Sequence, residues 1–308
     1  MKKRLIAVLC ICAMLLAGCA PVTETAEEQK QVYASFFPIY ALSGLVLQDI
    51  PEIDVKCFIQ PQDDCLRLYD LSDWDASVLA YDADVVIIGG RGLEAFESAL
   101  YTFGEGGPAV INSMYGLRLH NDDGSSILDG NTGHLADANP YLYMSVPGAR
   151  QMINVIAPAM AMLYPEYAEK IAGGLQRTDK ELEKLYTENT ALCADIKGEK
   201  VILMNEALIY VAEDYGLEVV YRYDRESGTT LYGEGLTAAI NDLRNLDADV
   251  ILIEKQAPAE LTKALEAEGF TVVKIDIMNS YPANAGPEHY YEVQRNNAAA
   301  LADAFGGR

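Results

Sequence analysis

Histidine, tryptophan and basic residues are scarce in this chain of 308 residues. It has three histidines and one tryptophan, and its 23 lysines and arginines are outnumbered by 46 aspartates and glutamates, giving a formal net charge of −23. A protein that binds nucleic acid by neutralising phosphates needs a basic surface, so that class is excluded. Three histidines also leave little room for a histidine-rich metal site.

The common catalytic motifs are absent as well. The sequence contains neither a Gly-x-Ser-x-Gly nor a His-Glu-x-x-His motif. The run Gly89-Gly90-Arg91-Gly92 follows a predicted strand but lacks the third glycine of a dinucleotide-binding loop. The aspartates between positions 63 and 75 are typical of a solvated acidic loop, because nothing in the sequence positions them for acid–base chemistry. We therefore predict that the protein is not an enzyme and has no catalytic residues.

No apolar run is long enough to span a bilayer. The longest, Leu5 to Leu16, has about 12 residues where a membrane helix needs about 20, and it follows a basic segment. Residues 1–18 are predicted to be an export signal. The end of this segment, Leu16-Ala17-Gly18-Cys19, resembles the bacterial lipobox, which implies that Cys19 is acylated and anchors the chain to a membrane. Residues 19–31 would then form a polar tether.

Three cysteines remain after Cys19 and the two in the signal: Cys57, Cys65 and Cys193. An exported protein can form disulfides, and Cys57 with Cys65 is the favoured pairing. Cys193 would then be a small buried hydrophobic residue. The sequence alone leaves the pairing open.

From Val32 onward, short apolar runs alternate with longer amphipathic ones, as in β-α-β units with parallel sheets. The pattern predicts an α/β fold of two lobes, each a mainly parallel sheet flanked by helices, joined by one long helix. We expect the N-terminal lobe over 32–165, the connecting helix over 166–195 and the C-terminal lobe over 196–308. A ligand cleft is expected between the lobes, at the carboxyl ends of the strands.

Individual elements are predicted from the same periodicities. Strands are expected over 32–36, 54–59, 84–88, 109–112, 200–204, 218–221, 249–253 and 271–275. Helices are expected over 38–47, 75–81, 93–100, 146–163, 166–194, 207–215, 235–245, 258–268 and 288–305. Residues 117–138 are predicted to be a loop containing His120 and His134. Two adjacent glycines, Gly173 and Gly174, interrupt the long helix and predict a kink or a close helix contact there.

The order of these pieces resembles the metal-type substrate-binding lipoproteins of ABC importers, the zinc and manganese class. The resemblance covers most of the chain and implies two Rossmann-like lobes bridged by one rigid helix. It is carried by the following segments: Ala34-Ser35-Phe36-Phe37-Pro38-Ile39-Tyr40, Ala83-Asp84-Val85-Val86-Ile87-Ile88 with Gly92-Leu93-Glu94, Asn139-Pro140-Tyr141-Leu142-Tyr143, Asn205-Glu206-Ala207 with Tyr215-Gly216-Leu217, and Asp276.

The resemblance also implies where cargo binds. The family's first metal-binding histidine falls in the segment 61–70, where this chain has Arg67 or Leu66, and the second falls on Tyr141. The third ligand falls on Asn205, beside Glu206, and the fourth is retained as Asp276. The expected ligand-binding residues are therefore Arg67, Tyr141, Asn205, Glu206 and Asp276, of which Glu206 and Asp276 can also bind a metal.

Zinc and manganese sites need imidazole, thiolate or carboxylate ligands, and an arginine would repel the cation. Three interpretations stay open. The cleft binds a polar organic or anionic ligand through Arg67; Arg67 pairs with Asp70 or Asp276 in an empty cleft; or a metal site is rebuilt from Asp63, Asp64, Cys65, Glu206, Asp276 and a loop histidine such as His134. His289 is expected to have a structural role.

By resemblance, we expect a lipid-anchored receptor outside the cytoplasm, at the cell surface or in the periplasm. Its partners would be the permease and ATPase subunits of an ABC importer, and its cargo a small solute or a metal ion of the zinc or manganese class. No resident cofactor is expected. The rival interpretations are the same fold binding an organic ligand, a surface lipoprotein or adhesin without a role in transport, and a hydrolase that uses the acidic loop around Asp63 and Asp64.

Overall fold

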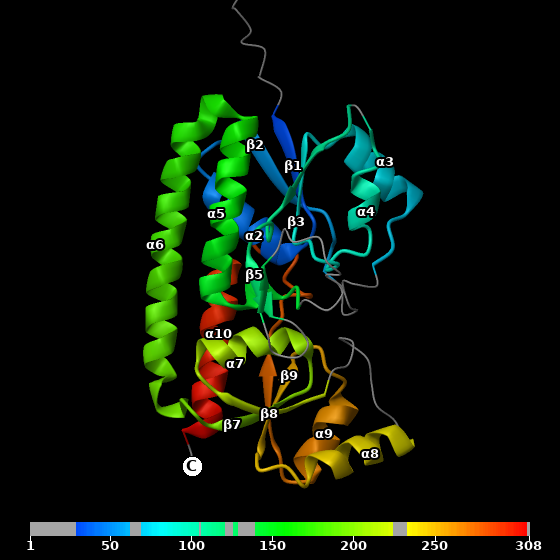
Figure 1. Ribbon diagram of the computed structural model, residues 1–308, viewed down its shortest axis with the longest axis vertical. Coiled ribbons are helices and arrows are strands. Elements are labelled where there is room, and N and C mark those ends of the chain that lie inside the picture. Colours follow the sequence, from blue (N-terminus) through cyan, green and yellow to red (C-terminus); the bar gives the residue numbers. More distant parts are fainter. Residues whose placement is uncertain are drawn as a thin grey trace, which may run out of the picture.

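Two α/β lobes are stacked along the long axis of the computed structural model, and long helices run along one side of both (Figure 1). The structure describes residues 29–61, 69–104, 106–120, 126–128, 139–223 and 233–306. Two of the predicted functional residues, Cys19 and Arg67, lie outside these residues, as do Asp63, Asp64, Cys65 and His134. Within the described residues, no helix has both the length and the apolar composition needed to cross a membrane.

The N-terminal lobe contains a parallel four-stranded sheet in the order β2-β1-β3-β4. Its strands are β1 (Lys30–Ala34), β2 (Ile53–Cys57), β3 (Val85–Ile88) and β4 (Ala109–Asn112), and its helices α2 (Phe37–Leu47), α3 (Asp73–Tyr81) and α4 (Glu97–Leu100). All four residues of the inner strand β3 are buried. This burial explains its unbroken apolar sequence, since an inner parallel strand is covered on both faces.

The C-terminal lobe repeats this arrangement with strand order β10-β9-β7-β8. Its strands are β7 (Lys200–Leu203), β8 (Glu218–Arg222), β9 (Val250–Glu254) and β10 (Thr271–Ile275). Its helical segments are η6 (Glu206–Leu208), α7 (Ile209–Asp214), α8 (Gly233–Leu243) and α9 (Ala259–Ala267). The predicted fold class is therefore confirmed.

Three helices connect the lobes. α5 (Val146–Leu163) and α6 (Ala168–Leu192) form a hairpin through the short helix η4 (Pro165–Tyr167), and α10 (His289–Phe305) packs on α6. At 1.5 Å per residue, the 25 residues of α6 extend about 37 Å. Its first half contacts α2 of the N-terminal lobe, where Thr178 donates to the Leu45 carbonyl at 2.9 Å. Its second half contacts the C-terminal lobe, where Asn189 donates to the Gln294 carbonyl at 3.2 Å.

The main apolar core is continuous through both lobes. It extends from the sheet of the N-terminal lobe, through α5, α6 and α10, to the inner face of the second sheet. A smaller core lies on the other face of that sheet, under α8 and α9. The lobes are therefore held together by shared packing as well as by chain connections.

Two elements differ from the predictions. The expected loop 117–138 includes the antiparallel pair β5 (Arg118–His120) and β6 (Ser126–Leu128), and three residues per strand are too few to show alternation. The helix expected over 93–100 is reduced to α4. Here the buried Glu94 carboxylate turns back and accepts the N–H groups of Gly89 and Gly90 at 2.7 and 2.8 Å. These two amides are therefore not available to hold a phosphate.

Cys57 forms no disulfide, and its favoured partner, Cys65, lies outside the described residues. Cys57 is a free thiol that donates to the Ile59 carbonyl at 3.3 Å and accepts from the Tyr281 hydroxyl at 3.2 Å. Burial raises the pKa of the Cys57 thiol to about 11, so it is uncharged at neutral pH. Cys193 is free and buried, as expected.

The glycine pair in α6 marks a close contact, and α6 continues through it as a single helix. A Cβ atom at Gly174 would lie 1.9 Å from the Val46 carbonyl oxygen of α2, a separation that sterics forbid. A Cβ atom at Gly173 would meet nothing within 4 Å. Only the second glycine is thus required for α6 to pack on α2.

The two glycines make a matched pair for a stability test. We expect Gly174→Ala to lower the free energy of unfolding by about 3 kcal/mol, because α6 must move away from α2. Gly173→Ala should raise the free energy of unfolding by up to about 1 kcal/mol through helix propensity alone. Urea denaturation of both variants measures the difference, and equal effects would contradict the packing described here.

Candidate functional site

Three of the segments that carry the predicted ligand residues meet between the lobes. Asn139 donates from Nδ2 to the Glu206 carbonyl at 2.7 Å, and Tyr210 donates to the Asn139 carbonyl at 2.8 Å. Tyr143 donates to the Ile277 carbonyl at 3.3 Å. Glu206 follows β7 and Ile277 follows β10, so the meeting point lies at the carboxyl ends of two parallel strands. Open α/β sheets bind ligands at this end.

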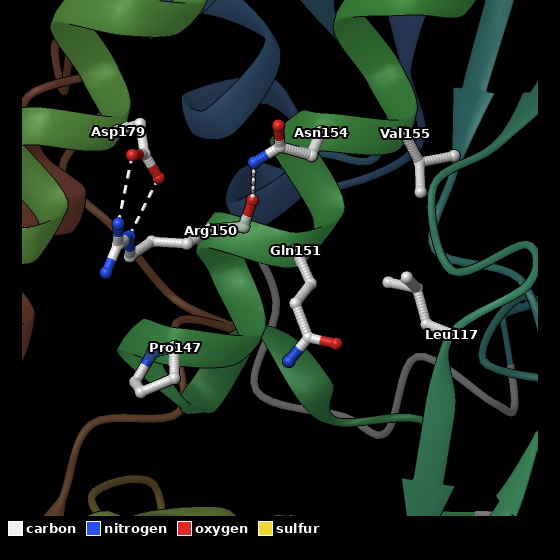
Figure 2. Close-up of a pocket in the computed structure, with 7 residues that line it drawn as sticks. All are labelled: Leu117, Pro147, Arg150, Gln151, Asn154, Val155 and Asp179. Carbon is white, nitrogen blue, oxygen red and sulfur yellow. Dashed lines mark hydrogen bonds and ion pairs between the residues drawn. The ribbon is translucent and has the colours of Figure 1, made fainter.

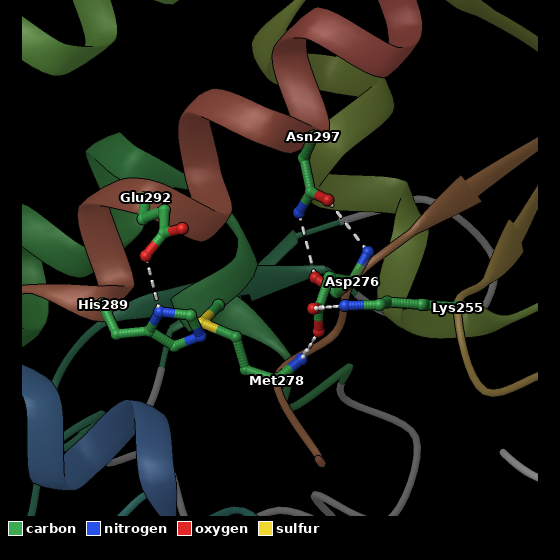
Figure 3. A network of polar contacts seen from close by, with 6 residues as sticks. All are labelled: Lys255, Asp276, Met278, His289, Glu292 and Asn297. Atoms are coloured by element: carbon green, nitrogen blue, oxygen red, sulfur yellow. Dashed lines mark hydrogen bonds and ion pairs between the residues drawn. The ribbon is translucent and has the colours of Figure 1, made fainter. Parts of the chain in front are cut away.

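Asp276 has the most completely defined surroundings of the predicted ligands (Figure 3). One carboxylate oxygen accepts the Met278 N–H at 2.9 Å, and the other accepts the Lys255 ammonium at 2.9 Å. Its main-chain N–H and C=O are both bound by the Asn297 amide at 2.9 Å. The Asp276 side chain is 12% exposed and that of Lys255 is 62% exposed. The carboxylate is therefore held in place and presents one oxygen to a cation.

Asn205 and Glu206 lie at the start of η6. Asn205 is buried, and its side-chain oxygen accepts the Ala207 N–H at 2.9 Å. This is the geometry of a helix N-cap, in which the amide oxygen binds an otherwise unpaired backbone donor. The Asn205 side-chain oxygen is thus engaged by its own helix, and contact of Asn205 with cargo stays a prediction. Glu206 is half-buried and binds Asn139 through its main chain.

Tyr141 is 5% exposed and belongs to the main core. Its N–H donates to the Asn139 side chain at 3.0 Å, and its ring lies 6.1 Å from that of Tyr143. Contact of Tyr141 with cargo stays a prediction, as does any role of Arg67, which lies outside the described residues.

The described part of the chain contains no group of three or more histidine, cysteine, aspartate or glutamate side chains that could hold a metal ion. Glu206 and Asp276 therefore do not complete a metal site by themselves. His289 has the structural role that was expected: its Nδ1 lies 2.9 Å from a Glu292 carboxylate oxygen, and its ring packs at 5.7 Å from that of Phe37.

Comparison with known proteins identifies the family. Residues 32–304 match the family described as ZnuA, zinc-uptake complex component A, periplasmic. The chain belongs to this ZnuA family. Membership confirms the predicted resemblance to metal-type substrate-binding proteins and the prediction that the protein is not an enzyme. It also agrees with the expected location outside the cytoplasm.

Curated relatives of the ZnuA-family chain include the zinc-binding protein AdcA of Streptococcus pyogenes. The serotype M3 protein is 19% identical over 322 residues, and the serotype M6 protein is 21% identical over 331 residues. Each alignment covers 98% of this chain and 61% of the relative, so the chain spans about three fifths of the relatives' length.

Solved structures share the fold. FpvC from Pseudomonas aeruginosa in complex with Mn²⁺ superposes with a TM-score of 0.76 at 20% identity, covering 91% of this chain and 99% of that one. Zn(II)-bound AdcA from Streptococcus pneumoniae gives 0.74 at 18% identity, covering 90% and 57%. A crystal structure of ZnuA gives 0.71 at 18% identity, covering 89% and 98%.

A groove of about 500 Å³ on α5 lies elsewhere in this ZnuA-family fold (Figure 2). Its charged groups are Arg150 and Asp179, which form a two-point ion pair between α5 and α6 at 2.7 and 2.9 Å. None of the predicted ligand residues lines this groove, so the junction beside Asp276 is the candidate cargo site.

Sequence reasoning missed the residues that complete this junction: Lys255, Asn297, Tyr210 and Asp214. The signal for Lys255 was present. Lys255 and Asp276 follow strands that were both predicted, and they become neighbours once these strands are paired. Asp214 gave no such signal, because its contact depends on how the lobes are packed.

Asp214 fixes the start of α5 from the opposite lobe. Its carboxylate accepts the Ser145 hydroxyl at 2.8 Å and the Val146 N–H at 2.9 Å. Partial burial raises the pKa of Asp214 to about 7, more than these hydrogen bonds lower it. The folded protein therefore binds this proton more tightly than the unfolded chain does.

This pKa predicts a pH effect on stability. The contribution of Asp214, at most about 4 kcal/mol, is fully present below pH 4 and lost as the pH rises through 7. Asn at this position cannot titrate. Its amide oxygen can accept the Val146 N–H, and its amide nitrogen can donate to the Ser145 hydroxyl oxygen in place of the bond that the carboxylate accepts. The melting temperature of the unmodified protein should therefore fall more steeply between pH 4 and 7 than that of Asp214→Asn. The exposed neighbour provides the control: Glu213→Gln should keep the steep profile, and parallel profiles for Asp214→Asn and the unmodified protein would refute the assignment.

Proposed function

We propose that the chain is the lipid-anchored substrate-binding protein of an ABC importer and delivers a divalent metal ion of the zinc or manganese class. Its partners would be the permease and ATPase subunits, and the lipid on Cys19 would retain it at the outer side of a bacterial membrane. The match to the ZnuA family over residues 32–304 supports the transport role. The basic and apolar residues before Cys19 support the anchor.

The observation that carries the cargo proposal is the convergence at Asp276. Hydrogen bonds from Asn139 and Tyr143 join the segment 139–145 to the ends of β7 and β10. The carboxylate at this junction is the family ligand that the chain retains. Relatives named as zinc-binding proteins and a fold neighbour in complex with Mn²⁺ support a transition-metal cargo.

One observation favours the second candidate, a polar organic or anionic cargo. Among the described residues, Asp276 is paired with a lysine, and no cluster of metal-binding side chains surrounds it. Arg67 would then bind an anionic group of that cargo. In this case the cleft is atypical for its family, because its cargo would be organic and the family's metal-binding histidines are replaced.

Metal binding separates the two candidates. Zn²⁺ or Mn²⁺ should raise the melting temperature of the purified protein by several degrees and remain bound in native mass spectrometry, because a ligand specific for the folded state stabilises it. Asp276→Asn should abolish the shift, whereas Asp247→Asn, which removes an exposed aspartate paired with Lys200, should retain it. A protein that binds neither metal, yet is purified with a bound organic molecule, would establish the second candidate.

The anchor is tested separately. Expressed in a bacterium with a lipoprotein-processing pathway, the chain should incorporate labelled fatty acid and partition into detergent. Cys19→Ala should lose both properties, since the acylated sulfur is removed. Cys193→Ser, which alters a buried free thiol, is the control and should keep them. Unchanged labelling of Cys19→Ala would overturn the lipid anchor.

A further inference from the structure

Lys255 lies beside Asp276 because the backbone places it there. β9 and β10 are adjacent parallel strands whose register ends at Glu254 and Ile275. The Lys255 N–H donates to the Ile275 carbonyl at 2.8 Å, so the ladder continues one step past the strands. The next two residues are Lys255 and Asp276 themselves. Their pairing is therefore a consequence of strand register rather than of a long side chain reaching across the surface.

The ammonium of Lys255 occupies one of the directions from which a metal could bind the Asp276 carboxylate. The Met278 N–H engages one carboxylate oxygen, and Lys255 Nζ lies 2.9 Å from the other. A Zn²⁺ ion bound to that oxygen would lie at about 2.0–2.2 Å, within about 1 Å of the nitrogen if it approached along the same direction. Two cations at such a separation repel each other strongly. The oxygen can thus serve the ammonium or the metal in this direction, but not both.

We propose that Lys255 determines cargo specificity as a tethered competitor, whose ammonium holds the Asp276 carboxylate until a divalent metal displaces it. This inference rests on the proposed function, because it takes Asp276 as a cargo ligand. It concerns a residue that supplies no bond to the metal. Because the Lys255 ammonium competes for the Asp276 carboxylate, a cation must bind its other ligands more strongly in order to displace it.

Exposure of the lysine makes the displacement reversible. The Lys255 side chain is 62% exposed, so its ammonium can return to water without being desolvated. Ion pairs at such sites are weak. Lys255 should therefore act as a mild competitor, lowering metal affinity about tenfold rather than abolishing it.

The test is calorimetric titration of the purified protein with Zn²⁺ and, separately, Mn²⁺. Lys255→Met should bind at least one of these metals about tenfold more tightly than the unmodified protein. Lys255→Arg keeps a cation beside Asp276 and should retain the lower affinity. Lys200→Met is the matched control, because it removes a lysine paired with an exposed aspartate in the same lobe. Its affinity should be unchanged. In the Asp276→Asn background, Lys255→Met should not change the metal affinity, because the carboxylate for which the lysine and the metal compete has been removed.

Each outcome decides the inference. Tighter binding by Lys255→Met than by the unmodified protein, with unchanged binding by Lys200→Met, supports it. Measurable binding by Lys255→Met alone overturns it, because the lysine would then abolish metal binding instead of weakening it. Equal affinities for Lys255→Met and the unmodified protein overturn it while leaving the proposed function intact. Weaker binding by Lys255→Met also overturns it, because the lysine would then assist the cargo. If neither protein binds either metal, both the inference and the metal cargo fail. Thermal unfolding without metal confirms that each variant is folded.

Discussion

The junction between the lobes depends on a set of hydrogen bonds that join residues 139–146 of one lobe to the other lobe. The Asn139 side chain donates to the Glu206 carbonyl, and the Asn139 carbonyl accepts the Tyr210 hydroxyl. Tyr143 donates to the Ile277 carbonyl just after β10. The Asp214 carboxylate accepts the Val146 N–H in the first turn of α5. Most of these groups are buried, where an unpaired polar atom is costly, so breaking the set is unfavourable. Residues 139–146 are therefore fixed to the C-terminal lobe.

Charge poses a separate constraint. With a net charge of −23, the protein attracts cations of every kind over long range, and this attraction is screened by salt but does not discriminate. Selection of one cation must come from contacts made at short range. The Lys255–Asp276 pair is such a contact, because it opposes any cation that cannot form strong bonds elsewhere in the cleft. The same pair explains how a carboxylate can stay ready for cargo without an uncompensated charge.

Much of the fold could be predicted from the sequence, for reasons visible in particular elements. The strand over 271–275 and the helix over 146–163 have the predicted bounds, since a β-branched run and a long amphipathic repeat are both unambiguous. The hairpin β5–β6 was missed because its strands are three residues long. A kink or a close helix contact was predicted at Gly173 and Gly174. That the contact is at Gly174, and that its partner is Val46, depends on the packing of α2.

The site was harder to predict than the fold. Asp276 precedes Ile277, whose carbonyl accepts the Tyr143 hydroxyl between the lobes, whereas Asn205 caps its own helix and Tyr141 is packed in the core. Contact of Asp276, Asn205 and Tyr141 with cargo stays a prediction. A sequence pattern gives residue types, and it does not show which polar atoms the backbone already engages. Lys255 illustrates the same limit, because its role depends on a strand register that only the folded chain defines.

Anomalous diffraction from crystals grown with Zn²⁺ tests the central claim most directly. The account predicts one strong zinc peak about 2.0–2.2 Å from an Asp276 carboxylate oxygen, with the Lys255 ammonium moved away into solvent. A zinc peak remote from Asp276, or one that leaves the Lys255–Asp276 pair in place, would contradict it.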